Sequence, residues 1–410
     1  MTPGPQPRAL SFYIVAAEES GDALGAALVR ALKARHGGAL TFNGVGGRAM
    51  AAAGVIGPFA IEELSIMGIA AIPRRLPMIF RRIRETATAV VAARPDALVI
   101  IDSPDFTHRV ARRVRRLAPK IPILDYVSPS IWAWRPGRAR AMRAYIDQVL
   151  AILPFEPALY VKLGGPPCRY VGHPLIERIA ELRPNAEEAQ RRRADPPVVL
   201  ILPGSRAGEI RHLLGTFGAA IEQIAPRCGP MQLVLPTVPH LAAQVRAAVA
   251  GWKIPPQIVV DPAEKWAAFR RARAALAASG TVTLELALAG IPTVAAYRMS
   301  PLEAFIVVKL VRLLARLPSV ILANLVLGEN VIPEFLQSDC TPERLADALL
   351  PLLSDTAPRQ RQIEAFGRLD AIMAIGAEAP SAKAAAIALD VAQQHGRRDL
   401  AAPAPGSASG

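Results

Sequence analysis

Two short turns in the second half of the chain have the residue types that bind a phosphate. Apolar residues 274–278 end at Ser279-Gly280-Thr281, and an alanine- and leucine-rich helical stretch follows. The first N–H groups of a helix are unpaired and form its positive end, which suits a phosphate. Glu285 follows about one turn later, near enough to accept hydrogen bonds from a ribose. An ordinary helix with Ser279 as its N-cap explains the same pattern.

The second turn, Pro203-Gly204-Ser205-Arg206, follows apolar residues 198–202. A guanidinium such as that of Arg206 neutralises phosphate oxygens, although a structural ion pair is an equal explanation for it. The sequence has no Asp-x-Asp and no His/Cys cluster, the patterns that hold a metal ion on a diphosphate. We therefore expect no metal and no cofactor, and we assign the charge of a leaving diphosphate to the two turns.

A candidate base lies in the first half. Asp102 and Asp105 follow the apolar residues 97–101, and a carboxylate there can accept a proton from an attacking hydroxyl. We predict Asp102 as this base. For Asp105 we favour the N-cap of the following helix, with contact to an acceptor as its alternative.

Other polar or aromatic residues near strand ends are candidates for contacts with an acceptor: Glu18, Ser20, Asp22, Ser128, Trp134 and His173. Asp22 is equally well explained as a helix N-cap. For His173 we favour a structural histidine held between glycine and proline. Trp134 can stack on a sugar or acyl chain, or pack in the core. Asn324 is a candidate polar contact in a cleft.

Apolar runs that end in polar or glycine clusters recur along the chain, with helical stretches between them. They are residues 11–17, 42–47, 97–101, 121–127, 148–153, 169–171, 198–202, 232–235, 257–260, 274–278 and 293–296. This alternation predicts an α/β fold with two Rossmann-like domains, which bind ligands at the carboxyl ends of their strands. We place the domains at 11–182 and 198–355 and expect a substrate cleft between them.

Residues 183–197 are arginine-rich, bounded by proline and without an apolar period, so we predict an interdomain segment there. Residues 399–410 have the composition of a disordered tail.

The composition favours anionic partners. The 410 residues are 52% hydrophobic and carry a net charge of +14, most of it in the first half. The three cysteines are scattered, which fits a reducing compartment. Only 5% of the residues are aromatic, and the arginines flank aliphatic runs, whereas single-stranded nucleic acid binding needs basic residues interleaved with aromatics. We therefore expect no nucleic-acid partner.

Two stretches have the composition of helices that lie on an anionic lipid surface. Residues 61–84, from Ile61 to Arg84, mix apolar side chains with five arginines. Residues 302–317, from Leu302 to Leu317, are apolar apart from four charges. A core helix with a solvated arginine edge is the alternative for each. No charge-free stretch of about 20 residues and no signal-peptide core is present.

Taken together, the motifs resemble those of the lipid-A-disaccharide synthases over residues 12–389. The most specific piece is the run Tyr126-Val127-Ser128-Pro129-Ser130-Ile131-Trp132-Ala133-Trp134-Arg135. Other matching pieces are Glu18-x-Ser20-Gly21-Asp22, Gly44-Val45-Gly46-Gly47, Ile101-Asp102-Ser103-Pro104-Asp105-Phe106, Leu202-Pro203-Gly204-Ser205-Arg206 and Ala278-Ser279-Gly280-Thr281.

The resemblance implies a GT-B fold, with residues 356–398 returning to the first domain. It implies an inverting transfer of 2,3-diacylglucosamine from its UDP conjugate to 2,3-diacylglucosamine 1-phosphate (lipid X). The family's essential aspartate corresponds to Asp102 and its diphosphate arginine to Arg206. Its nucleotide-binding turn and cleft asparagine correspond to Ser279, Gly280, Thr281, Glu285 and Asn324. One departure is Glu329, which replaces an arginine common in the family.

The resemblance also implies a cytoplasmic protein that associates peripherally with the cytoplasmic face of the inner membrane through residues 61–84. A homodimer with exchanged C-terminal segments is compatible with it. The alternatives are a UDP-N-acetylglucosamine epimerase or lipid-linked N-acetylglucosaminyltransferase on the same scaffold, and a non-catalytic protein that binds anionic surfaces or nucleic acid.

Overall fold

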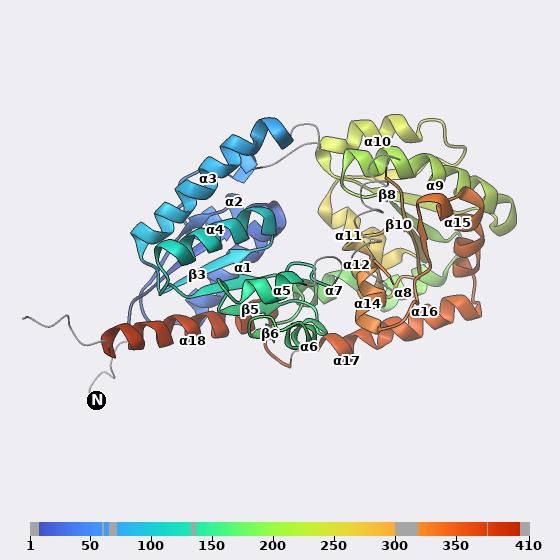
Figure 1. The fold of residues 1–410 in the computed structure, drawn as a ribbon. Helices are drawn as coiled ribbons and strands as arrows, with labels where there is room; N and C mark the ends of the chain where they lie inside the picture. The colour runs from blue at the N-terminus through green and yellow to red at the C-terminus, as the bar shows by residue number, and fades with distance from the viewer. Residues whose placement is uncertain are drawn as a thin grey trace, which may run out of the picture. The chain divides into compact units, whose positions relative to one another are not determined.

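Each half of the chain folds around its own six-stranded parallel sheet (Figure 1). The computed structural model describes residues 8–59, 61–64, 72–132, 137–299, 319–374 and 376–401. Two compact units result: Met1–Ile176 with Ile375–Gly410, and Glu177–Ala374. The first unit therefore combines the beginning of the chain with its last helix.

The first sheet has the strand order β2-β1-β3-β4-β5-β6. Its strands are β1 (Leu10–Ala16), β2 (Leu40–Val45), β3 (Ala97–Ile101), β4 (Ile123–Tyr126), β5 (Gln148–Ala151) and β6 (Cys168–Tyr170). Alternate residues face opposite sides, so Phe12 and Ile14 belong to one buried cluster while Tyr13 and Val15 belong to another. Because both faces are covered, the central strands appear in the sequence as continuous apolar runs.

Helices cover both faces of this sheet. They are α1 (Glu19–Arg35), α2 (Arg48–Ala52), α3 (Ile72–Ala93), α4 (Pro104–Leu117), α5 (Gly137–Met142), α6 (Glu156–Lys162) and α18 (Pro380–Ala401). The clusters show α1 and α18 on one face and α3 and α4 on the other. Of residues 356–398, which were expected to return to the first domain, α18 does so, whereas α16 (Ala357–Gly367) and α17 (Leu369–Met373) lie in the second unit.

The second sheet has the order β12-β11-β10-β7-β8-β9. Its strands are β7 (Val198–Leu202), β8 (Gln232–Pro236), β9 (Gln257–Val259), β10 (Ala274–Ala278), β11 (Thr293–Tyr297) and β12 (Glu334–Leu336). The chain starts in the middle at β7, moves outward to β9 and then returns to β10, which pairs with β7 through Leu202 and Ala277. The strand order therefore reverses between β7 and β10.

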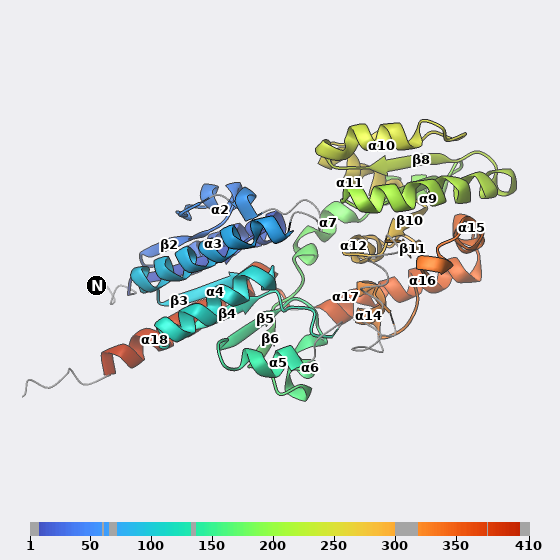
Figure 2. The same cartoon turned by 45° about the horizontal axis from the view of Figure 1, so that its top comes forward.

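The helices of the second unit include three that share the cluster on one face of the sheet, namely α9 (Ala207–Cys228), α10 (Ala242–Val249) and α15 (Pro342–Leu349). Figure 2 shows α9 beside α10. Besides α16 and α17, the described part of the unit also contains α7 (Ile179–Leu182), α8 (Ala186–Arg193), α11 (Pro262–Arg271), α12 (Val282–Leu288) and α14 (Leu322–Leu327). Both α11 and α12 contact the central strands.

Residues 183–197 are not an interdomain segment but part of the second unit, and they contain α8. Asn185 and Glu188 form a capping box at its start. The Arg192 guanidinium donates hydrogen bonds to backbone carbonyls of the same unit, including that of Phe269 at 3.1 Å. Capping and arginine hydrogen bonds hold this helix without an apolar face, so hydrophobic periodicity could not reveal it.

Candidate functional site

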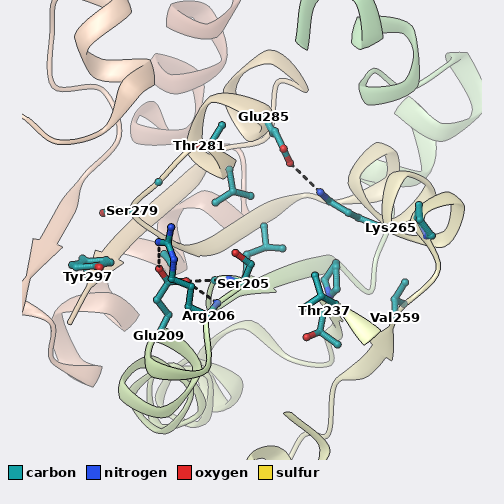
Figure 3. Close-up of a pocket in the computed structure, with 18 of the residues that line it drawn as sticks. Ser205, Arg206, Glu209, Thr237, Val259, Lys265, Ser279, Thr281, Glu285 and Tyr297 are labelled. Carbon is teal, nitrogen blue, oxygen red and sulfur yellow. Dashed lines mark hydrogen bonds and ion pairs between the residues drawn. The ribbon is translucent and has the colours of Figure 1, made fainter. Parts of the chain in front are cut away.

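A pocket of about 1030 Å³ lies in the second unit. The residues that follow β7, β8, β9 and β10 line it, so it occupies the carboxyl edge of the sheet. The two central turns come from β7 and β10, between which the strand order reverses. Ligands of open α/β sheets bind at this kind of position. The pocket therefore brings the two predicted phosphate-binding turns together (Figure 3).

The turn after β7 already holds a negatively charged oxygen. Glu209 Oε2 accepts hydrogen bonds from the N–H groups of Ser205 at 3.0 Å and Arg206 at 3.2 Å. Gly204 has φ +107°, and a Cβ there would lie 2.1 Å from this oxygen, so the turn requires glycine. Successive N–H groups in such a turn form an anion-binding concavity. The N–H groups of this turn therefore bind a carboxylate oxygen of the same chain, and phosphate binding by the turn stays a prediction.

Arg206 lines the pocket with its side chain 79% exposed. Its guanidinium donates to Glu209 Oε1 at 3.1 Å. The ion-pair explanation of Arg206 is thus confirmed, and the exposed guanidinium also faces the pocket. Sequence reasoning missed Glu209, although its position three residues after the N-cap is the spacing of a capping box.

The turn after β10 differs from the prediction in one respect. Helix α12 has Thr281 as its N-cap, so Ser279 is not the cap. The Ser279 N–H continues the sheet by donating to the Ala296 carbonyl at 2.8 Å, which places the helix start two residues later. Ser279, Gly280 and Thr281 nevertheless all line the pocket.

Glu285 lines the pocket one turn into α12, as its position in the sequence indicated. Its Oε2 lies 3.1 Å from Nζ of Lys265 on α11. Lys265 had no motif to mark it in the sequence. The fold places the Lys265 ammonium beside Glu285, which the spacing of the two residues in the sequence does not indicate (Figure 3).

Asn324 was expected to make a polar contact in a cleft, but it is not among the residues that line the pocket. Its side chain is buried, and its amide group forms hydrogen bonds within the chain. Nδ2 donates to Ser319 Oγ at 3.2 Å and to the Ile332 carbonyl at 3.0 Å. Oδ1 accepts from the N–H groups of Val331 at 3.1 Å and Ile332 at 2.9 Å. Asn324 therefore fastens the segment after α14 to the start of that helix.

Glu334 on β12 is a polar residue that the sequence did not single out. It accepts hydrogen bonds from Ser279 Oγ at 3.4 Å and Ser319 Oγ at 3.1 Å. Burial raises the pKa of Glu334 above its ordinary value. The carboxyl group links the phosphate-suited turn to the segment before α14. Glu329, the departure from the family pattern, pairs with Arg368.

In the first unit, Asp102 directly follows β3 with φ 49°, and Ser103 comes next with φ 46°, both in the left-handed region. Such backbone strain costs about 1 kcal/mol or more per residue and concentrates at functional sites. Burial is the main cause that raises the pKa of Asp102, and the charges of Glu18 and Asp125 raise it further. A carboxylate with these properties is a better proton acceptor than an exposed aspartate.

Two other aspartates of this unit differ from their predicted N-cap positions. Asp105 lies within the first turn of α4, whose N-cap is Ser103, so the N-cap prediction for Asp105 is wrong. Asp22 lies inside α1 and caps a different helix. Its Oδ1 accepts from the N–H of Gly47 at 2.7 Å and its Oδ2 from that of Ala49 at 2.9 Å, at the start of α2. Because these bonds occupy the buried carboxylate, the structure does not support Asp22 as an acceptor contact.

The remaining acceptor candidates divide by exposure. Glu18 and Ser20 are exposed at the start of α1. Ser128 is buried and shares a 2.9 Å hydrogen bond with the Tyr160 hydroxyl. His173 is buried, and its Nδ1 accepts from the Leu175 N–H at 3.2 Å. Burial lowers the pKa of His173 to about 4, which keeps it neutral, so the structural explanation of His173 is the one that its geometry supports.

Trp134, residues 65–71 and residues 302–317 lie outside the described residues. Within the described ranges, no helix combines the length and hydrophobicity needed to cross a bilayer. In the same part of the chain, no group of three or more His, Cys, Asp or Glu side chains could hold a metal ion.

The chain is similar to curated proteins over almost its whole length. A sequence model described as lipid-A-disaccharide synthetase matches residues 12–388. The lipid-A-disaccharide synthase of Rhodopseudomonas palustris (strain HaA2) is 60% identical over 93% of this chain and 96% of that protein. The protein of the same name from Bradyrhizobium diazoefficiens is 61% identical over 94% of this chain and 97% of its own length.

Solved structures show the same fold at low identity. MurG from Acinetobacter baumannii has a TM-score of 0.56 and 16% identity, and it covers 95% of this chain and 100% of its own. The S. aureus MnaA–UDP co-structure has a TM-score of 0.59 and 12% identity, covering 98% and 100%. These likenesses, with the two parallel sheets, confirm the predicted GT-B fold class. From the family match over residues 12–388 and the identities near 60%, this chain belongs to the lipid-A-disaccharide synthase family of glycosyltransferases.

Proposed function

We propose that the chain transfers 2,3-diacylglucosamine from UDP to the 6-hydroxyl of 2,3-diacylglucosamine 1-phosphate. The products are the β-1,6-linked disaccharide 1-phosphate and UDP. The observation that carries this proposal is the pair of anion-suited turns on one pocket, in a chain of this family. The two acylated sugars are the substrates that family membership implies.

The pocket of the second unit is the proposed site for UDP. The exposed guanidinium of Arg206 would face the diphosphate, and the turn formed by Ser279, Gly280 and Thr281 would make the second contact. Glu285 would accept hydrogen bonds from the ribose. An exposed guanidinium that can move toward a diphosphate gains a charge-assisted hydrogen bond, worth roughly 1.5–3 kcal/mol.

Asp102 of the first unit is the proposed base. Its carboxylate takes the proton of the 6-hydroxyl while the oxygen attacks the anomeric carbon. The bond from this carbon to the UDP oxygen breaks, and the negative charge leaves with UDP. Arg206 and the turn at Gly280 and Thr281 stabilise that charge as it develops. A single displacement inverts the anomeric centre and needs one base.

A turnover assay tests the proposal. The purified chain is given UDP-2,3-diacylglucosamine and 2,3-diacylglucosamine 1-phosphate in the presence of a chelator, and UDP and disaccharide are both measured. We expect the two products in equal amounts. UDP without disaccharide would indicate hydrolysis, and dependence on added Mg²⁺ would contradict the charge assignment.

We also propose that the N-terminal part of α3 contacts an anionic membrane surface. Leu76 and Phe80 are 40% and 44% exposed there, and the Arg109 guanidinium of α4 lies 5.4 Å from the Phe80 ring centroid. Arg81 adds a further exposed cation. Apolar side chains flanked by arginines match an interfacial helix.

Flotation with vesicles tests this surface. The wild-type chain should float with vesicles that contain phosphatidylglycerol and less with purely zwitterionic ones. The double variant Leu76→Ser/Phe80→Ser should lose most of this binding. Val161→Ser is the control, since Val161 is 82% exposed on α6 of the same unit. Equal losses in both variants would contradict a specific surface.

The homodimer expected from the sequence stays a prediction. Light scattering of the purified chain would measure its oligomeric state.

A further inference from the structure

Lys265, one member of an ion pair that lines the nucleotide pocket, has no part in the function described so far. Lys265 lies in the first turn of α11 and Glu285 in α12, and both side chains line the pocket. Nζ of Lys265 is 3.1 Å from Oε2 of Glu285 (Figure 3). The two side chains are 29% and 18% exposed, so solvent screens this pair less than an ion pair on the open surface.

Aromatic rings restrict the position of the Lys265 ammonium. Nζ lies 4.0 Å from the centroid of the Trp266 ring and 5.3 Å from that of Phe269. The two rings pack edge to face, with centroids 5.3 Å apart. A cation over an aromatic face is attracted by the negative face of the ring. The ammonium therefore has a preferred place, although a lysine on an open surface would move among many rotamers.

The ion pair leaves part of the carboxylate for a ligand. Oε2 of Glu285 accepts the hydrogen bond from Lys265. The second carboxylate oxygen, Oε1, takes no part in this bond and can accept one from a ligand. A carboxylate whose one oxygen is fixed presents the other in a defined direction. The acceptor sites of a carboxylate are enough for hydrogen bonds from two hydroxyls.

We infer that Lys265 is a positioning residue that orients Glu285, and thereby sets the preference of the pocket for a ribose over a deoxyribose. The inference rests on the proposed role of the pocket as the UDP site. It does not place Lys265 itself on the nucleotide. Two other roles for Lys265 make different predictions: direct contact with the diphosphate, or a purely structural link between α11 and α12.

Calorimetry with UDP, 2′-deoxy-UDP and 3′-deoxy-UDP separates these roles. The wild-type chain should bind UDP about tenfold more tightly than at least one of the two deoxy analogues. That analogue lacks a hydroxyl that donates a hydrogen bond to the Glu285 carboxylate. Lys265→Met should reduce this preference to about threefold or less, mainly because the variant binds UDP more weakly. Lys265→Arg should keep most of the preference, because it restores the cation.

Two further variants make the comparison specific. Glu285→Gln should reduce the preference as Lys265→Met does, and the double variant should reduce it no further than Glu285→Gln alone. Lys253→Met is the matched control, because Lys253 makes an ion pair of the same 3.1 Å length with Glu222 on the surface of the same unit. It should leave the preference unchanged.

The outcomes distinguish the inference from its premise. Equal weakening of all three ligands in Lys265→Met would overturn the positioning role and indicate either phosphate contact or loss of structure. A wild-type chain that binds UDP without any preference would also overturn it. A wild-type chain that does not bind UDP at all would instead contradict the proposed nucleotide site.

Discussion

The substitution Asp102→Asn should separate catalysis from stability. Asparagine has the size of aspartate and is one of the residues that tolerate a positive φ, so it fits the backbone at φ 49°. It cannot accept a proton as a base. A general base contributes about 10²–10⁴-fold to a rate, which corresponds to about 2.7–5.4 kcal/mol at the transition state. We expect kcat/KM for disaccharide formation to fall within this range.

The same substitution should not lower the melting temperature at pH 7. The pKa of Asp102 is raised in the folded chain, chiefly by burial. The folded state therefore binds this proton more tightly than the unfolded chain does, so the stability contributed by Asp102 is present at low pH and is lost as the pH rises through the raised pKa. A neutral asparagine removes the cost of burying the charge at pH 7, and we expect an unchanged or higher melting temperature.

The assay measures UDP release and disaccharide together, with calorimetry of UDP binding and a thermal melt on the same preparation. Asp390→Asn, at an exposed position on α18, is the control for removing one negative charge from the first unit. Turnover within about threefold of wild type would refute Asp102 as the base. A large loss of turnover together with a lower melting temperature would refute the reasoning from burial.

Three further perturbations have defined outcomes. Glu18→Gln removes a negative charge that raises the pKa of Asp102, so the acid limb of the pH profile of kcat/KM should move to lower pH, and an unmoved limb would contradict this coupling. Asn324→Ala leaves several buried backbone groups unpaired, so calorimetry should show a loss of about 3 kcal/mol of stability; a loss below about 1 kcal/mol would argue against the fastening role. His173 has its pKa lowered to about 4 by burial, so its stabilising contribution is present above its usual pKa of 6.5 and is lost as the pH falls toward about 4. His173→Gln should flatten that part of the stability curve, and an equally steep curve would show that other groups cause the loss.

The sequence alone was sufficient for the fold class and for the two turns of the pocket. Strands buried on both faces must be apolar throughout, and their turns must be polar or glycine-rich, so the apolar runs located the central strands to within a residue or two. Three of the strands, β3, β7 and β10, have the predicted bounds. Arg206 and Glu285 were identified because each occurs within a few residues of a strand end, and the pocket at that edge contains both.

Contacts between distant residues could be decided only by the tertiary structure. Asp22 caps α2 rather than α1, and Asn324 bonds to residues on both sides of its own helix, because side-chain partners depend on which segments the fold makes adjacent. Helix α8 has no apolar stripe, and β12 is only three residues long, so neither produced a periodic signal. The pairing of Lys265 with Glu285 spans 20 residues and three secondary-structure elements. A linear pattern determines which residues can carry chemistry, whereas the distances that select their partners arise only when the sheet order is set.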